Sequence, residues 1–166
     1  MGICSIPVMK MGVGVEWALH CCVALAWLEG DRPVSIGWLA GWFGVPQEYL
    51  KKRLQGLVRA GILESTAGVG GGFGLARAAE RITVMDVVVA VEGGAEPFRC
   101  TEIRQQGVGG VGSVSKFTRP CGVAVAMRRA EMAWRRELAA QTIADLVRVA
   151  PAETAARARK HFAQNG

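Results

Sequence analysis

The sequence predicts a mainly α-helical fold that carries one small β-hairpin, an α+β arrangement. Two short helical patterns stand on either side of a tight turn at Gly44, which is typical of a helix-turn-helix. Two short apolar runs then flank a glycine-rich tip at 68–72, as expected for a β-hairpin. Farther on, a long helical pattern covers 122–140. The order of these elements predicts a winged helix-turn-helix followed by a long helix, which we expect to be a dimerisation helix.

Length and composition limit the kind of protein this is. A chain of 166 residues suggests one domain with a small appendage. Hydrophobic residues make up 51% of it, which is more than a small soluble monomer needs, so we expect a buried partner surface. No apolar run reaches the ~18 residues of a membrane helix, because Glu16, His20 and Glu29 interrupt the richest stretch. The net charge of +6 favours an anionic partner such as nucleic acid.

The cysteines point to an intracellular protein. The chain has five, at Cys4, Cys21, Cys22, Cys100 and Cys121. This odd number, without a secretory signal in residues 1–15, argues against a disulfide framework. We therefore expect a cytoplasmic location, where a cysteine is a core residue, a metal ligand or a redox sensor. Cys21 and Cys22 lie inside an apolar helical pattern and are expected in the core, whereas Cys4 stays unassigned.

The first part of the chain contains four helical patterns. They cover residues 15–28, 36–42, 46–60 and 84–91. Ser35 and Thr83 are expected to cap the second and fourth helices, and Pro46 opens the third. The strands of the hairpin are expected at 62–65 and 73–75, and this hairpin is the wing.

The second part of the chain has less regular helical patterns than the first. A polar, glycine-rich stretch runs to Pro120, and the long helical pattern follows it. Thr142 is expected to cap a short helix that ends at Val149, and the Ala/Arg-rich tail after Pro151 is expected to be a frayed helix. The predicted divisions are a winged helix-turn-helix domain at 9–94, a loop at 95–121, the dimerisation helix and a short helix at 122–150, and a tail at 151–166.

The helix-turn-helix and the wing together predict DNA binding. The first turn of a recognition helix enters the major groove, and basic residues near it neutralise phosphates. Glutamine pairs with adenine and lysine with guanine, and glycines let the wing backbone approach a phosphate. The candidate contacts are Ser35, Gln47, Glu48, Tyr49, Lys51, Lys52, Arg53, Gly71, Gly72 and Arg77. For the charged residues alone, a solvated helix face is the alternative.

Glycines at Gly107–Gly112 match the G-x-G-x-x-G pattern. A dinucleotide site also needs a strand before this pattern and a helix that opens on it. The surrounding residues are polar, so we interpret this segment as a flexible loop.

Two pairs of residues are candidates for a metal centre. Glu16 and His20 are four residues apart, so they share one face of the first helix. They can bind one metal, or they can form a simple Glu–His pair. Cys100 and Cys121 stand at the ends of a 20-residue loop, which can bring both thiolates to one metal or let them form a reversible disulfide.

Several stretches of the sequence resemble the Rrf-two family of bacterial winged-helix transcription regulators. They are Gly14–Cys22, Gly71–Arg77, Ile82–Val88 and Thr142–Leu146. The resemblance runs from about residue 9 to residue 149. It implies a homodimer that binds double-stranded operator DNA, is not an enzyme, and has neither a membrane partner nor a small-molecule substrate. Many members of the family also hold an iron–sulfur cluster near the dimer interface.

The region around the loop cysteines is similar to a redox-sensing branch of this family. Phe98–Gln105, Pro120–Cys121 and Ala130–Arg135 carry this likeness. It implies a [2Fe–2S] cluster held by Cys100 and Cys121 of one subunit and by Glu16 and His20 of the other. Other members carry three closely spaced cysteines, a pattern this chain lacks. The alternatives are a metal-free thiol/disulfide-sensing repressor, a repressor that has lost its cluster, and a redox enzyme.

Overall fold

The computed structural model describes residues 11–30, 32–94, 98–106 and 119–166. The chain forms two compact units: a first unit of residues 1–94 and 138–166, and a second unit of residues 95–137. Cys4 and the Gly107–Gly112 pattern lie outside the described residues.

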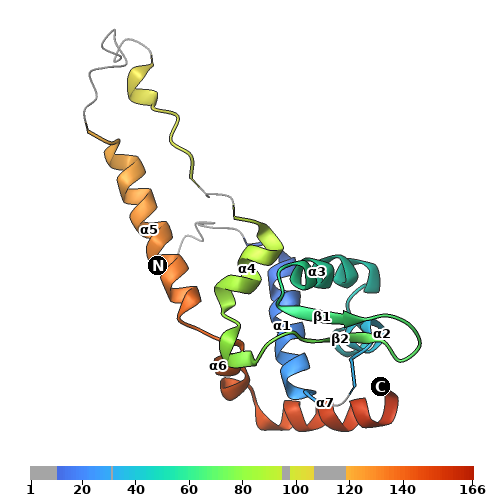
Figure 1. Ribbon diagram of the computed structural model, residues 1–166. Coiled ribbons are helices and arrows are strands. Elements are labelled where there is room, and N and C mark those ends of the chain that lie inside the picture. The colour runs from blue at the N-terminus through green and yellow to red at the C-terminus, as the bar shows by residue number, and fades with distance from the viewer. Residues whose placement is uncertain (1–10, 31, 95–97, 107–118) are drawn as a thin grey trace, which may run out of the picture. The chain divides into compact units, whose positions relative to one another are not determined.

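Helices dominate the first unit, as the sequence predicts (Figure 1). Its elements are α1 (Val13–Trp27), α2 (Ile36–Phe43), α3 (Gln47–Arg59), β1 (Leu63–Thr66), β2 (Gly72–Leu75), η1 (Ala79–Arg81), α4 (Val84–Glu92), α6 (Ile143–Val149) and α7 (Ala152–Asn165). The mainly helical fold with one small antiparallel sheet is thereby confirmed, and the predicted helices agree with these bounds to within about two residues.

The central helix of the first unit is α1, which packs against α3, α4, α6, α7 and β2. Its sequence is apolar on most sides, because a helix with neighbours all round needs apolar side chains on every face. Ala18, Cys21 and Cys22 have no exposed surface. The predicted core role of the two cysteines is confirmed.

The helix-turn-helix consists of α2, a turn and α3. The Ser35 hydroxyl accepts a hydrogen bond from the Trp38 backbone N–H at 3.1 Å and so caps α2, as predicted. Gly44 ends α2 with a φ of 63°, a conformation that glycine adopts without strain. Leu50, Leu54 and Leu57 follow one face of α3 and are fully buried. The opposite face of α3 therefore faces outward.

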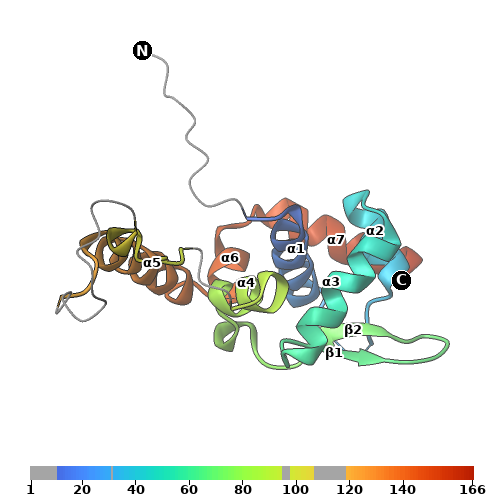
Figure 2. The same cartoon turned by 90° about the horizontal axis from the view of Figure 1, so that it is seen from above.

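The wing is an antiparallel hairpin in which Leu63 pairs with Leu75 and Thr66 pairs with Gly72. Its connecting loop projects beyond α3 (Figure 2). Val34, just before α2, pairs with β2 through one isolated antiparallel bridge. Val34 and Phe73 exchange backbone hydrogen bonds of 2.9 and 2.8 Å. This bridge ties the base of the wing to the start of the helix-turn-helix.

Two capping boxes set the starts of α4 and α6. Thr83 and Asp86 cap α4 reciprocally, and Thr142 and Asp145 cap α6 in the same way. The two starts are also joined, because the Ile143 backbone N–H donates to the Ile82 carbonyl at 2.9 Å. This junction joins the carboxy-terminal part of the first unit to its amino-terminal part.

The tail differs from its prediction, because 152–165 is a packed helix, α7, rather than a frayed one. Ala158 and Phe162 are buried, and the Phe162 ring meets the Trp38 ring edge-on with centroids 5.4 Å apart. Arg32 donates to the Phe162 and Gly166 carbonyls at 3.0 and 2.9 Å. Phe162 of the tail and Arg32 of the preceding part of the chain thus hold α7 in place, although the tail has few large apolar side chains.

The second unit contains the short 3-10 helix η2 (Ile103–Gln105) and most of the long α5 (Gly122–Ala139). No residue of α5 is buried within this chain. In the part of the chain that the structure describes, no helix has both the length and the apolar character needed to cross a bilayer.

Candidate functional site

The start of α3 and the base of the wing border a surface hollow of about 460 Å³. Six of the ten predicted DNA contacts line it: Ser35, Gln47, Glu48, Lys51, Gly71 and Gly72. They come from the cap of α2, the first turn of α3 and the wing. The fold therefore gathers residues separated by up to 37 positions, Ser35 to Gly72, on one surface.

The chemistry of this hollow suits a nucleic acid. Gln47, Glu48 and Lys51 are all exposed and lie in the first turns of α3. Their amide, carboxylate and ammonium groups are those that read base edges or bind phosphates. The buried leucines on the other face of α3 anchor the helix to the core and leave these side chains on its exposed face.

Tyr49 and Lys52 lie on α3 outside the residues that line the hollow. Both are exposed, Tyr49 by 65%. Such freely exposed side chains on a recognition helix are available to contact phosphates beside the groove.

Two predicted DNA contacts have partners inside the protein. Arg53 is half-buried, and its guanidinium lies so close to Gly14 of α1 that a Cβ there would meet Arg53 Cζ at 2.8 Å. Arg77 donates to the Asp86 carboxylate at 3.1 Å. In this structure, Arg53 packs on α1 and Arg77 supports the cap of α4.

The wing glycines are explained by contacts within the chain. A Cβ on Gly71 would overlap the Thr66 carbonyl oxygen, and a Cβ on Gly72 would overlap the Val34 carbonyl. Only glycine allows the backbone to pass this closely. The sequence predicted close approach to a phosphate, and the structure shows close approach of backbone to backbone.

A second cluster lies in the second unit, where Cys100, Glu102 and Cys121 meet. Their sulfur and carboxylate oxygen atoms all lie within 4.8 Å of one another. Cys100 Sγ donates to Glu102 Oε1 at 3.4 Å, and Arg104 Nη2 donates to Glu102 Oε2 at 2.6 Å. Among the described residues, this is the one group of three His, Cys, Asp or Glu side chains close enough to hold a metal ion.

The two thiols of this cluster differ in acidity. Hydrogen bonds from the Ala124 and Val123 backbone N–H groups, at the start of α5, lower the pKa of Cys121. At Cys100, the Glu102 backbone N–H acts to lower the pKa, but desolvation and the neighbouring Glu102 and Cys121 side chains together raise it. By contrast, burial raises the pKa of Cys21 to about 12.

Glu16 and His20 belong to the first unit, where both are exposed on α1. They line a mostly apolar hollow of about 800 Å³ whose walls include Trp42 and Phe43. The His20 and Phe43 ring centroids are 5.8 Å apart. The predicted Glu–His face of α1 is thus open to an incoming partner.

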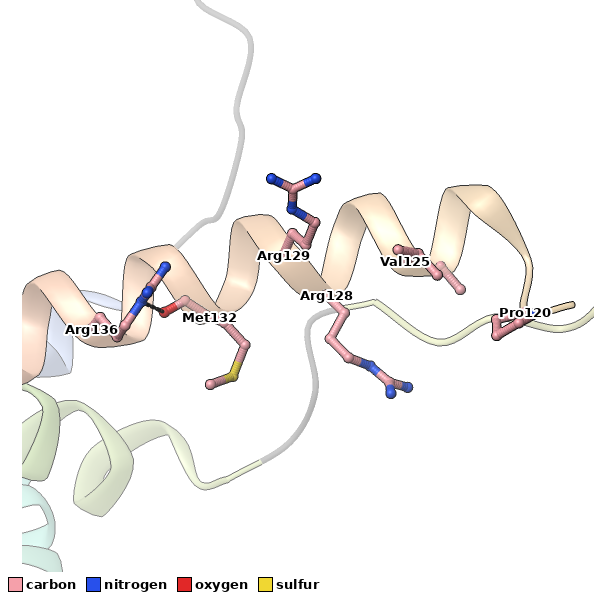
Figure 3. Close-up of a pocket in the computed structure, with 7 residues that line it drawn as sticks. Pro120, Val125, Arg128, Arg129, Met132 and Arg136 are labelled. Carbon is pink, nitrogen blue, oxygen red and sulfur yellow. Dashed lines mark hydrogen bonds between the residues drawn. The ribbon is translucent and has the colours of Figure 1, made fainter.

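One face of α5 carries exposed apolar side chains between arginines (Figure 3). Val125 and Met132 are 46% and 51% exposed. Arg128 and Arg136 lie along the same hollow of about 470 Å³, and the Arg136 Nε donates to the Met132 carbonyl at 3.3 Å. This surface leaves apolar area uncovered within one chain.

Sequence reasoning missed Glu102 and Arg104 as site residues. The available signal was the short Cys-x-Glu-x-Arg spacing from Cys100. Spacing alone does not give the backbone turn that brings these side chains back to the thiol: Glu102 adopts a φ of 49°, and it is the one non-glycine residue with positive φ among those described.

Comparison with known proteins identifies the family that has this architecture. The family model for Rrf2, described as an iron-dependent transcriptional regulator, matches residues 12–149. YffB of Lactococcus lactis, named as an HTH-type transcriptional regulator, is 32% identical over 138 residues, which cover 83% of this chain and 86% of YffB.

Solved structures share the fold. CymR, the global cysteine regulator of B. subtilis, has a TM-score of 0.69 at 22% identity, with coverage of 87% of this chain and 100% of CymR. T. potens IscR has a TM-score of 0.63 at 21% identity, with coverage of 84% and 87%. The family match and the fold are those of transcriptional regulators and not of enzymes. Because the family model covers most of the chain, this protein belongs to the Rrf2 family of transcriptional regulators.

Proposed function

We propose that this protein is a redox-sensing regulator that binds operator DNA in the cytoplasm as a homodimer. In this proposal, Cys100 and Cys121 of one subunit and Glu16 and His20 of the other hold a [2Fe–2S] cluster. The observation that carries it is the meeting of two thiols from opposite ends of a 20-residue loop within 4.8 Å of each other.

The donor set fits such a group. Two thiols at this separation suit one iron, and thiolates are the usual ligands of iron–sulfur clusters. Glu16 and His20 offer a carboxylate and an imidazole one helical turn apart on an exposed surface. A cluster bound to these residues supplies a one-electron redox change. The family description as iron-dependent and the likeness to IscR support this assignment.

The chain's own residues perform the DNA binding. Gln47 and Lys51 are presented to the major groove by α3, and the wing loop lies beside them. Basic side chains on this face neutralise phosphates, which gives sequence-independent affinity, while base-edge contacts give specificity.

The dimer is proposed to form through α5. One face of this helix exposes Val125 and Met132, and none of its residues is buried within the chain. Packing two copies of this helix would cover that apolar surface. A dimer also sets the spacing of two DNA-binding surfaces, so a change at shared ligands can change operator affinity.

Anaerobic purification tests the cluster. We expect a coloured protein with two iron and two sulfide per cluster, and we expect His20→Ala to alter both the visible spectrum and operator affinity. The control is His161→Ala, the other histidine of the chain, on α7; it is compared by the visible spectrum alone, because its ring packs against Trp38 and Trp42 of α2. Iron-free, colourless protein that still responds to oxidants would contradict the cluster.

A second candidate is a metal-free thiol switch. The adjacent thiols and the lowered pKa of Cys121 favour it, because a thiolate next to a thiol is the starting point for disulfide formation. Hydrogen peroxide would take up the two electrons and the two thiol protons as the Cys100–Cys121 S–S bond forms, and its O–O bond would break to give two molecules of water. Mass spectrometry of oxidised protein would then show a loss of about 2 Da and a Cys100–Cys121 cross-link.

A further inference from the structure

The cluster proposal leaves one donor of the second unit without a role. Glu102 contacts the Cys100 thiol at 3.4 Å, and its carboxylate lies within 4.8 Å of both sulfurs. All three side chains come from the same unit of the same chain. They therefore form a ligand set that needs nothing from a partner subunit.

The carboxylate is held in a ligand-like orientation. Arg104 Nη2 binds Oε2 at 2.6 Å, which leaves Oε1 directed at Cys100 Sγ. The positive φ of Glu102 turns the chain so that the side chain returns toward the thiol two residues earlier. A charged partner on the second oxygen is the usual way in which proteins orient a carboxylate ligand.

We propose that Cys100, Glu102 and Cys121 form a single-chain site for one thiophilic divalent cation of the zinc class. Two thiolates and a single carboxylate oxygen are zinc ligands, and water completes a tetrahedral set. This site does not rest on the proposed cluster, but it uses the same two thiols. A bound ion and a cluster therefore exclude each other.

The distances allow this occupancy. With Zn–S bonds of about 2.3 Å, a tetrahedral ion places two sulfurs about 3.8 Å apart. The three donors already lie within 4.8 Å of one another, so they need to close by about 1 Å or less. Binding releases the thiol protons to solvent, and no electrons are transferred. The Arg104–Glu102 ion pair is kept, because the ion binds the other oxygen.

Cobalt titration of the reduced, metal-free, full-length protein tests the site. We expect one Co²⁺ per chain, with thiolate-to-cobalt absorption and the visible bands of a tetrahedral ion, and we expect Zn²⁺ to displace it. Glu102→Gln should weaken binding by at least about tenfold. The matched control is Glu131→Gln, which removes the carboxylate of another arginine pair in the same unit, 2.7 Å from Arg135.

Two further variants keep the outcome unambiguous. Cys100→Ser alters an exposed thiol and should weaken cobalt binding and reduce the thiolate-to-cobalt absorption, with circular dichroism to confirm that each variant is folded. His20→Ala should leave cobalt binding unchanged, even though the cluster proposal requires His20. Unchanged affinity in Glu102→Gln, one ion per two chains, or loss of binding in His20→Ala would each overturn the single-chain site. Iron-free protein as purified would contradict the cluster alone.

Discussion

Individual residues in the wing show how backbone geometry restricts sequence. Gly71 and Gly72 lie where the hairpin touches its own chain, at the Thr66 and Val34 carbonyls. The restriction is steric, because a side chain would need the volume that these carbonyls occupy. Their glycine character therefore follows from folding, whether or not DNA also approaches them.

Gly72→Ala is expected to destabilise the protein by about 1–3 kcal/mol, because the Cβ of the alanine would overlap backbone atoms that cannot move independently. Urea denaturation measures this loss. The control is Gly41→Ala, since a Cβ at this exposed position of α2 meets nothing within 4 Å. That change should stabilise by about 0.5–1 kcal/mol through helix propensity. Equal effects of the two substitutions would contradict the steric explanation.

Arginines are the residues whose roles the sequence predicts least well. Arg53 lies in the recognition helix and Arg77 just beyond the wing, and their positions and charges made them candidates for DNA contact. In the structure, Arg53 lies on Gly14 and Arg77 pairs with Asp86. A long, flexible side chain reaches partners that are distant in sequence, and sequence spacing does not report such partners.

At the scale of elements, helix caps and amphipathic faces give the clearest agreement between sequence and structure. Ser35, Thr83 and Thr142 cap the helices that they were expected to cap. These are local interactions within four residues, so neighbouring letters of the sequence are sufficient to specify them. The three leucines on the inner face of α3 follow from helical periodicity in the same way.

The cap of α6 predicts a pH dependence. Hydrogen bonds from the Thr142 backbone N–H and hydroxyl, together with Arg148, lower the pKa of Asp145 in the folded protein. The unfolded chain then binds the proton more readily. The stabilisation is therefore present above the unfolded pKa, about 3.9, and is lost as pH falls through the lower folded pKa.

Asp145→Asn should thus reduce stability at neutral pH and flatten the acid side of the stability profile. Thermal unfolding between about pH 7 and pH 3 measures both effects. A variant that loses stability with acid as steeply as the wild type would show that another group causes the dependence.

The outward face of α3 gives a prediction on binding. Lys51→Ala should weaken binding to duplex DNA and lower the slope of log affinity against log salt by about 1, because one phosphate contact and its released counterion are lost. Fluorescence anisotropy at several salt concentrations measures the slope. Lys160→Ala, an exposed lysine on α7 outside this hollow, should keep the wild-type slope. The assignment of this surface fails if both variants behave alike.

At the scale of the whole molecule, the important contrast is between apolar surface that the chain covers itself and apolar surface that it leaves exposed. Within the first unit, α7 covers Trp38 through Phe162. On α5, by contrast, Val125 and Met132 remain about half exposed. Apolar surface left uncovered on one chain favours association with another, and the proposed dimer would account for a composition more apolar than a small monomer needs.

Met132→Glu is expected to weaken the dimer by about tenfold or more, because it places a charge in the proposed interface. Sedimentation velocity over a range of concentrations measures the dissociation constant. The control is Val149→Glu on α6, an equally apolar residue that is 79% exposed. Wild-type protein that stays monomeric at all concentrations would rule out the dimer.

By itself, the sequence determined the order of the elements, their caps, the helix-turn-helix with its wing and the burial of Cys21 and Cys22, because short-range spacing and periodicity encode each of them. Tertiary structure decided which distant residues meet. It packed α7 against α2 through Phe162 and brought Glu102 to the thiols of Cys100 and Cys121. These contacts depend on how loops close and how helices pack, and such long-range geometry has no local signature in the sequence.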